Sequence, residues 1–156
     1  MKSVLFAVVA AAVLGLALMP RADAQSAPSG QDVRVTITDV QTRPGHLLGA
    51  LYTESNFLRG AGVYGVTMPP PAQAGTIVMV FHHVAPGTYA FSVMHDENDD
   101  HQMRKDARGI PLEGWAFSRG AALMGPPTFA TTNFTVADQP VNMIVHMFYP
   151  YVPPAQ

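Results

Sequence analysis

The chain has 156 residues and no cysteine; 48% of its residues are hydrophobic, 13% are charged, and the formal net charge is -2. This length favours one domain, and the scarcity of charged residues disfavours a coiled coil or long polar helices. The missing cysteine excludes disulfides, thiolate zinc sites and cysteine nucleophiles, and the small negative charge gives no electrostatic basis for nucleic-acid binding.

The N-terminal segment has the three parts of a secretory signal peptide. Lys2 supplies the positive charge, an uncharged apolar run spans Val4 to Met19, and Ala22-Asp23-Ala24 has the small-x-small pattern of a cleavage site. The pattern predicts cleavage between Ala24 and Gln25, and so a periplasmic or secreted protein. A membrane anchor is the alternative, but the run is short for a span of about 20 residues. After cleavage, no remaining stretch of sequence is long and apolar enough to cross a bilayer.

The next part of the chain predicts two strands and a loop. Apolar and polar residues alternate from Asp32 to Thr38, which predicts a half-buried strand. A second strand is predicted over His46–Thr53. Residues 60–74 are predicted to form a loop, because Pro69-Pro70-Pro71 cannot lie in a central strand. The residues that the first strand should direct to the core are Val33, Val35 and Ile37.

A hairpin is the strongest local prediction. Thr76–Val84 is predicted to be a strand, and its apolar run Ile77–Phe81 indicates burial on both faces or a central position. Ala85-Pro86-Gly87 predicts a tight turn, because proline presets one φ angle and glycine accepts a positive one. Thr88–Met94 then alternates again, so a hairpin is expected over Ile77–Met94.

A long excursion precedes the last two strands. Residues 95–127 are polar and rich in glycine and proline, and a loop of that length tends to be functional. Within it, Trp115 and Phe117 are expected to bury against the sheets and pin the loop. The last strands are predicted over Phe129–Val136 and Val141–Tyr149.

These elements, with no convincing helix, predict an all-β chain. The expected fold is an Ig-like, antiparallel β-sandwich of about seven strands with one long ordered loop. It should form a single domain over residues 31–149, preceded by a flexible lead-in at 25–30 and followed by a Pro-rich tail at 150–156.

An acidic segment suggests a calcium loop. Asp96, Asn98 and Asp100 have the i, i+2, i+4 spacing with which such loops begin, and Asp106 and Glu113 could add oxygens. The sixth, ninth and twelfth positions depart from the loop pattern; they are His101, Arg104 and Ala107. The metal ligands would be Asp96, Asn98, Asp100 and Asp106, and the alternative is a solvated acidic turn.

Two other chemistries stay open. A hydrolase could use His95 with Asp106 or Glu113, which requires one pocket that gathers all three. A copper protein could use methionine and histidine, because thioether and imidazole ligands suit copper. For copper, alternation sends His82 and His83 to opposite faces of their strand. Met143 and Met147 share a face, while His146 lies on the other.

Four motifs in a fixed order resemble a known family. They are Pro86–Ala90, His95–Asn98, Gly109–Ser118 and Gly125–Phe129. Their order is similar to that of the bacterial exported proteins called domain of unknown function 2141, and the similarity covers about residues 31–149. The proline-glycine turn also resembles that of carboxypeptidase-regulatory-like and transthyretin-like sandwich modules. The family resemblance implies a small secreted or periplasmic β-sandwich with no established activity. The positions that match its motifs are His95, Asp96, Asn98, Glu113, Trp115 and Ser118.

The sequence therefore favours an exported, non-enzymatic β-sandwich that serves as a binding or accessory module. A weak calcium site in the acidic loop 95–106 would accompany it, and the hydrolase and the copper protein are the alternatives. The expected partner is a protein or a small ligand.

Overall fold

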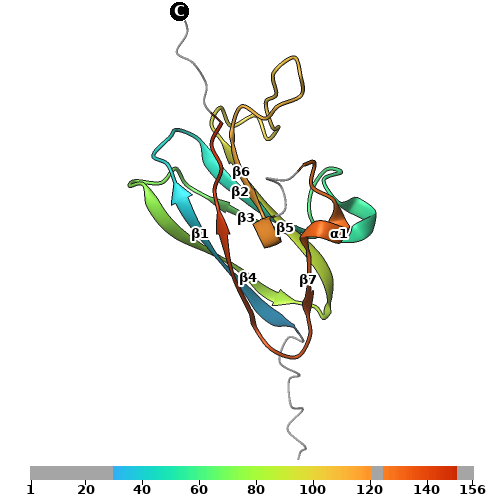
Figure 1. Ribbon diagram of the computed structural model, residues 1–156. Coiled ribbons are helices and arrows are strands. Elements are labelled where there is room, and N and C mark those ends of the chain that lie inside the picture. Colours follow the sequence, from blue (N-terminus) through green and yellow to red (C-terminus); the bar gives the residue numbers. More distant parts are fainter. Residues whose placement is uncertain (1–29, 121–124, 151–156) are drawn as a thin grey trace, which may run out of the picture.

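The computed structural model describes residues 30–120 and 125–150. About half of the described residues form eight strands in two sheets, so the all-β sandwich is confirmed (Figure 1). The three-stranded sheet has the order β4-β1-β8, with β1 at Gln31–Val40, β4 at Gly75–Val84 and β8 at Val141–His146. The five-stranded sheet has the order β3-β2-β5-β6, with β7 beside β5. Its strands are β2 (His46–Tyr52), β3 (Tyr64–Met68), β5 (Gly87–Asp96), β6 (Gly114–Phe117) and β7 (Asn133–Val136).

The predicted signal peptide, residues 1–24, lies outside the described residues, as do residues 25–29 and 151–156. In the part of the chain that is described, no helix has the length and apolar character to span a membrane.

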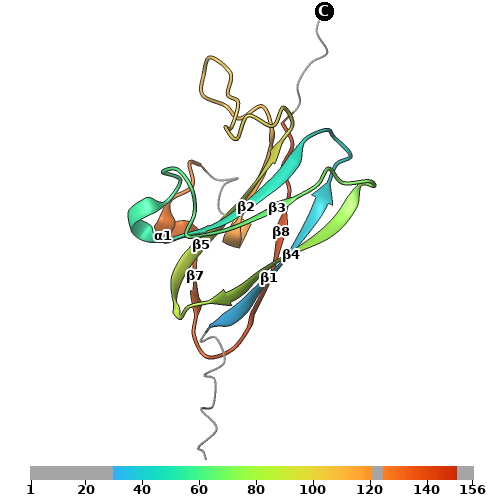
Figure 2. The same ribbon diagram turned by 180° about the vertical axis from the view of Figure 1, so that it is seen from behind.

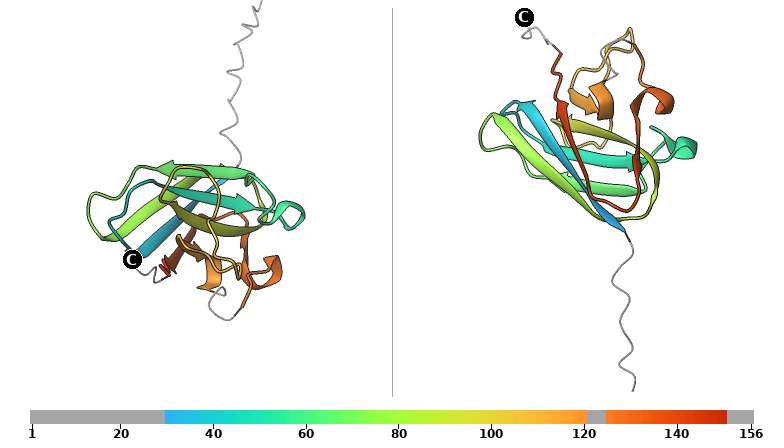
Figure 3. Two further views of the ribbon diagram at one scale, coloured as in Figure 1. Left: turned by 90° about the horizontal axis from the view of Figure 1, so that it is seen from above. Right: turned by 60° about the horizontal axis from the view of Figure 1, so that its bottom comes forward.

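The core lies between the two sheets, whose strands cross obliquely in the right-hand view of Figure 3. Alternation on β1 is confirmed, because Val33, Val35 and Ile37 are fully buried. On β8, Val145 also faces inward, as does Met147 directly after the strand, while Ile144 is exposed on the opposite face. The sheet is not purely antiparallel: β8 runs parallel to β1. Such a pair cannot be joined by a tight turn, and here β8 enters after the chain leaves β7 in the other sheet.

The predicted hairpin over Ile77–Met94 is wrong. Strand β4 pairs with β1, whereas β5 pairs with β2, β6 and β7, so the turn carries the chain from one sheet to the other. The apolar faces of the two strands therefore meet across the core, where the rings of Phe81 and Phe91 pack edge to face at 6.0 Å. The Tyr89 hydroxyl donates to the Ala85 carbonyl at 3.0 Å. This hydrogen bond stabilises the turn that connects the two sheets. Burial from opposite sheets removes both apolar faces from water, which a two-stranded hairpin alone cannot do.

Strand β4 is an edge strand, contrary to the predicted central position. Val78, on its outer face, is 40% exposed. His82 and His83 are both exposed, with ring centroids 6.3 Å apart. His83 has a positive φ of 54°, and the pairing with β1 shifts register beside it, which ends the regular alternation.

Three segments have different elements from those predicted. The loop 60–74 contains β3, and the excursion 95–127 contains β6. The first part of the predicted strand Phe129–Val136 is a short helix, α1 (Phe129–Thr132), begun by the Thr128 side chain accepting from the Thr131 N–H. A 3-10 turn, η1 (Glu54–Asn56), follows β2. Figures 1 and 2 show the segment between β5 and β6 projecting beyond one end of the sandwich.

Candidate functional site

The acidic segment at the end of β5 forms a tight loop closed by its own side-chain hydrogen bonds. Asp96 is fully buried, and its carboxylate accepts from the backbone N–H groups of Asp100 at 3.2 Å and His101 at 2.8 Å. The Asp100 carboxylate accepts from the Asn98 amide and the Gln102 N–H, both at 2.8 Å. These two hydrogen bonds lower the pKa of Asp100. The structure thus brings together Asp96, Asn98 and Asp100; the oxygens of the two aspartates cap the turn, and the Asn98 amide donates to Asp100.

Asp106 forms a separate turn. Its carboxylate accepts from the N–H groups of Ile110 and Arg108, both at 2.9 Å, and pairs with the Arg108 guanidinium at 3.0 Å. The bond from Ile110, followed by those from Arg108, lowers the pKa of Asp106. Across residues 30–120 and 125–150, no three histidine or acidic side chains are grouped closely enough to hold a metal.

Glu113 anchors the excursion. It is fully buried, and its carboxylate accepts from the N–H of Glu97 at 3.1 Å and of Arg104 at 2.9 Å. The Arg104 guanidinium lies 3.2 Å from the same carboxylate. Glu113 therefore joins both sides of segment 97–113 to the start of β6, a role that sequence reasoning did not identify.

His95 lies in a buried polar cluster. Its Nδ1 atom is 2.8 Å from the hydroxyl of Tyr149, which also accepts from the Gln41 N–H. The Nε2 atom of the same ring is buried and has no hydrogen-bond partner among the described residues. Burial lowers the pKa of His95, opposed by the charge of Glu97. Burial likewise raises the pKa of Tyr149, whose ring lies 4.7 Å below the Arg43 guanidinium.

The residues of the proposed hydrolase do not line the two best-formed pockets of the described chain. Neither of the two described pockets is lined by His95, Asp106 or Glu113. Ser118 is also buried; it accepts from the Phe91 N–H at 3.0 Å and donates to the Thr132 carbonyl. It therefore ties β5 to the segment that follows β6 and to α1.

A groove lies elsewhere, on the outer face of the five-stranded sheet. Register places two rows of outward side chains across β3, β2, β5 and β6. The first row is Thr67, Leu48, Met94 and Trp115, and the second is Gly65, Ala50, Ser92 and Phe117. These rows form the floor. Outward positions of a one-sided sheet are normally polar, so apolar side chains here indicate a covered or binding surface.

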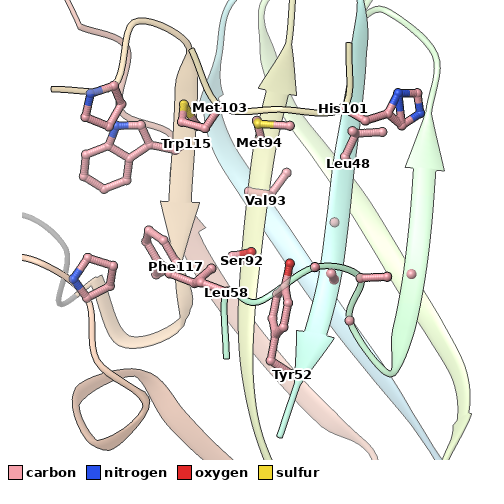
Figure 4. Close-up of a pocket in the computed structure, with 18 of the residues that line it drawn as sticks. Leu48, Tyr52, Leu58, Ser92, Val93, Met94, His101, Met103, Trp115 and Phe117 are labelled. Atoms are coloured by element: carbon pink, nitrogen blue, oxygen red, sulfur yellow. The ribbon is translucent and has the colours of Figure 1, made fainter. Parts of the chain in front are cut away.

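Three loop segments wall this groove, which has a volume of about 980 Å³. They contribute Leu58 and residues 60–62, then His101, Met103, Lys105 and residues 109–111, and finally residues 125–127. Figure 4 shows Met94, Met103 and His101 at one end of the floor, and Tyr52 and Leu58 at the other. The volume is that of a small-molecule site.

Trp115 and Phe117 were expected to bury against the sheets, and this is wrong. They point to the groove from β6 and are half-buried, while Ala116 between them faces the core. The Trp115 ring packs against Phe117 at 5.8 Å and against Phe148 at 5.2 Å. Sequence reasoning missed the groove, although apolar residues on both faces of β2, β5 and β6 were its signal.

Gly65 lies in the middle of β3 without a local need for glycine. Its φ is outside the left-handed region, and a Cβ added there would approach nothing nearer than the Gly49 carbonyl oxygen, at 4.0 Å. Glycine inside a strand is destabilising and often marks close approach of a ligand. The position lines the groove, so the missing side chain leaves its floor open.

The methionine and histidine residues are divided between core and groove. Met143 and Met147 face inward on the last strand, and His146 is exposed on the other side, as predicted. Met94, Met103 and His101 instead line the groove.

These features define a two-sheet β-sandwich with an open apolar groove on the outer face of one sheet. Residues 35–144, more than half of the chain, match the model of the family described as "Uncharacterized protein conserved in bacteria (DUF2141)", and the chain belongs to this family. This match confirms the resemblance found in the sequence motifs. Neither the search of curated proteins nor the search of solved structures found a significant match.

Proposed function

We propose that this protein is an exported, non-enzymatic binding module whose groove takes a small ligand with an extended apolar surface. Export rests on the signal-peptide pattern of residues 1–24.

The groove floor is the observation that carries this proposal. Leu48, Met94, Trp115 and Phe117 occupy outward positions on three adjacent strands, where water would otherwise cover them. Removing such surface from water contributes about 25 cal/mol per Å². The loops around the floor enclose it on several sides, so a ligand can be covered more fully than on a flat face.

One tryptophan in the sequence makes the test direct, since Trp115 lies in the groove. The uncharged fluorescent probe N-phenyl-1-naphthylamine is titrated into the protein. We expect saturable binding of one probe per chain, with quenching of Trp115 emission by energy transfer.

Gly65→Val is the matched test of location. It fills the floor with a side chain that suits a strand, and we expect at least about a tenfold loss of probe affinity, the effect of about 1.4 kcal/mol. Asn142→Val places the same side chain on the exposed face of the three-stranded sheet and should leave binding unchanged. Equal binding by both variants, or no saturable binding by the native protein, contradicts the proposal.

The calcium and copper hypotheses stay predictions. Calcium would have to share carboxylates that already accept backbone hydrogen bonds, whereas copper would find Met94, Met103 and His101 in the groove. Calorimetric titration with each ion tests them. Saturable heat that Asp100→Asn abolishes supports calcium, heat that Met94→Leu abolishes supports copper, and the absence of heat contradicts both.

A further inference from the structure

We propose that the ligand is an amphipathic anion: an alkyl chain that ends in a carboxylate, bound with the carboxylate at Lys105. This inference rests on the binding function proposed above and adds the chemical class of the ligand.

The described groove lining contains basic side chains but no acidic ones. Among the described lining residues, the basic side chains are Lys105 and His101, and none is a carboxylate. Lys105 has no ion pair within residues 30–120 and 125–150. By contrast, Arg104 pairs with Glu113 and Arg108 with Asp106. The exposed Lys105 ammonium is therefore free to pair with an external anion at the groove.

Lys105 is held in an ordered ribbon. It forms an antiparallel bridge with Pro111, and hydrogen bonds of 2.8 and 2.9 Å flank the bridge, from the Leu112 N–H to the Arg104 carbonyl and from the Asp106 N–H to the Ile110 carbonyl. Glu113, which follows Leu112 at the end of the ribbon, is fully buried. Ile110 and Pro111 line the groove as well, so the ribbon contributes Lys105 and an apolar wall together.

The carboxylates nearest this end are already engaged. Asp99 lines a smaller adjoining hollow and lies 2.7 Å from the Nδ1 atom of His46. Asp96 is fully buried beneath the loop and accepts from two backbone N–H groups. His101, the other basic residue of the lining, lies 3.9 Å from the Asp96 carboxylate, so Lys105 is the basic lining residue without a carboxylate partner among the described residues.

The floor suits an alkyl chain. Met94 and Met103 lie at the His101 end, and their unbranched thioether side chains adapt to an apolar partner (Figure 4). Beyond them the floor row of Gly65, Ala50 and Ser92 consists of small residues. From β3 to β6 the floor crosses three strand spacings, about 14 Å in all. An elongated alkyl chain can therefore lie across the strands and cover the floor, whereas a compact ligand would leave part of the floor exposed to water.

Three ligands of one chain length test the charge. Decanoate, decanol and decyltrimethylammonium, each below its micelle concentration, are titrated against the protein with bound N-phenyl-1-naphthylamine. We expect decanoate to bind about fivefold more tightly than decanol, the effect of a partly exposed ion pair of about 1 kcal/mol, and the cation to bind most weakly. Added salt should reduce the preference.

Lys105→Met should lower decanoate affinity to that of decanol and leave decanol binding unchanged, and Lys105→Arg should keep the preference. Arg59→Gln is the control, since it removes the same charge from an exposed position that does not line the groove. Equal binding of decanoate and decanol, or a preference that survives Lys105→Met, overturns this inference and leaves the binding function standing. Failure of the probe and of all three ligands to bind overturns both.

Discussion

At the scale of single residues, His95 links the core to the pH of the medium. Its imidazole is fully buried and neutral, held at Nδ1 by the Tyr149 hydroxyl. Burial lowers its pKa in the fold, so below about pH 6.5 the unfolded chain binds a proton that the folded chain rejects. The contribution of His95 to stability is complete above that pH, and it is lost as the pH falls toward the depressed pKa of the folded state.

We therefore expect the free energy of unfolding to decrease between pH 7.5 and 5.5, and His95→Gln to weaken that dependence. Urea denaturation at both pH values measures it. His83→Asn is the control, because His83 is exposed and asparagine tolerates its positive φ. A pH dependence that is the same in His95→Gln and in the native protein would refute this role.

At the scale of elements, Glu113 determines the order of segment 97–113. One buried carboxylate accepts from two backbone N–H groups and one guanidinium on that segment. Glu113→Gln keeps the shape but removes the charge, and we expect a loss of about 2 kcal/mol, typical of hydrogen bonds to a charged group. Trypsin should then cut faster at Arg104, Lys105 and Arg108.

The control for Glu113→Gln is Glu54→Gln on η1, where the side chain is exposed. Surface changes of this kind stay within about 0.5 kcal/mol. If Glu113→Gln unfolds at the same urea concentration as the control, the carboxylate does not hold the segment.

At the scale of the whole molecule, the fold depends on two sheets that bury each other. Phe91 of β5 packs on Phe81 of β4 across the core, and these strands are consecutive in the chain but belong to different sheets. Phe91→Ala opens a cavity between the sheets and should reduce stability by about 3–5 kcal/mol. Ile144→Ala removes an apolar side chain that is 66% exposed and should change it little. Urea midpoints that shift equally in the two variants would argue against a shared core at Phe91.

Much of the strand content was predictable, because alternation is a property of one strand. The buried faces of β1 and β8 follow from Val33, Val35 and Ile37, and from Val145 with Met147 just beyond the strand. Strand β3 was missed because glycine and proline surround its alternating Tyr64, Val66 and Met68. The order of short motifs also sufficed to identify the family.

The candidate site was less predictable, because its residues are distant in sequence. Asp96, Asp106 and Glu113 were chosen for their chemistry, and the fold uses each of them to cap or anchor a turn. Gly65 and Met94 were not predicted as site residues, although strand register places both in the groove floor with Trp115.

The sequence by itself determined that this protein is built of strands, which side chains of several strands face inward, and the family to which it belongs. Only the tertiary structure decided that β4 and β5 lie in different sheets, that β8 runs parallel to β1, and that outward apolar residues line a groove. The physical reason is the distance along the sequence over which each interaction acts. The period of two acts between neighbouring residues, whereas strand pairing and the groove depend on which distant apolar faces bury one another.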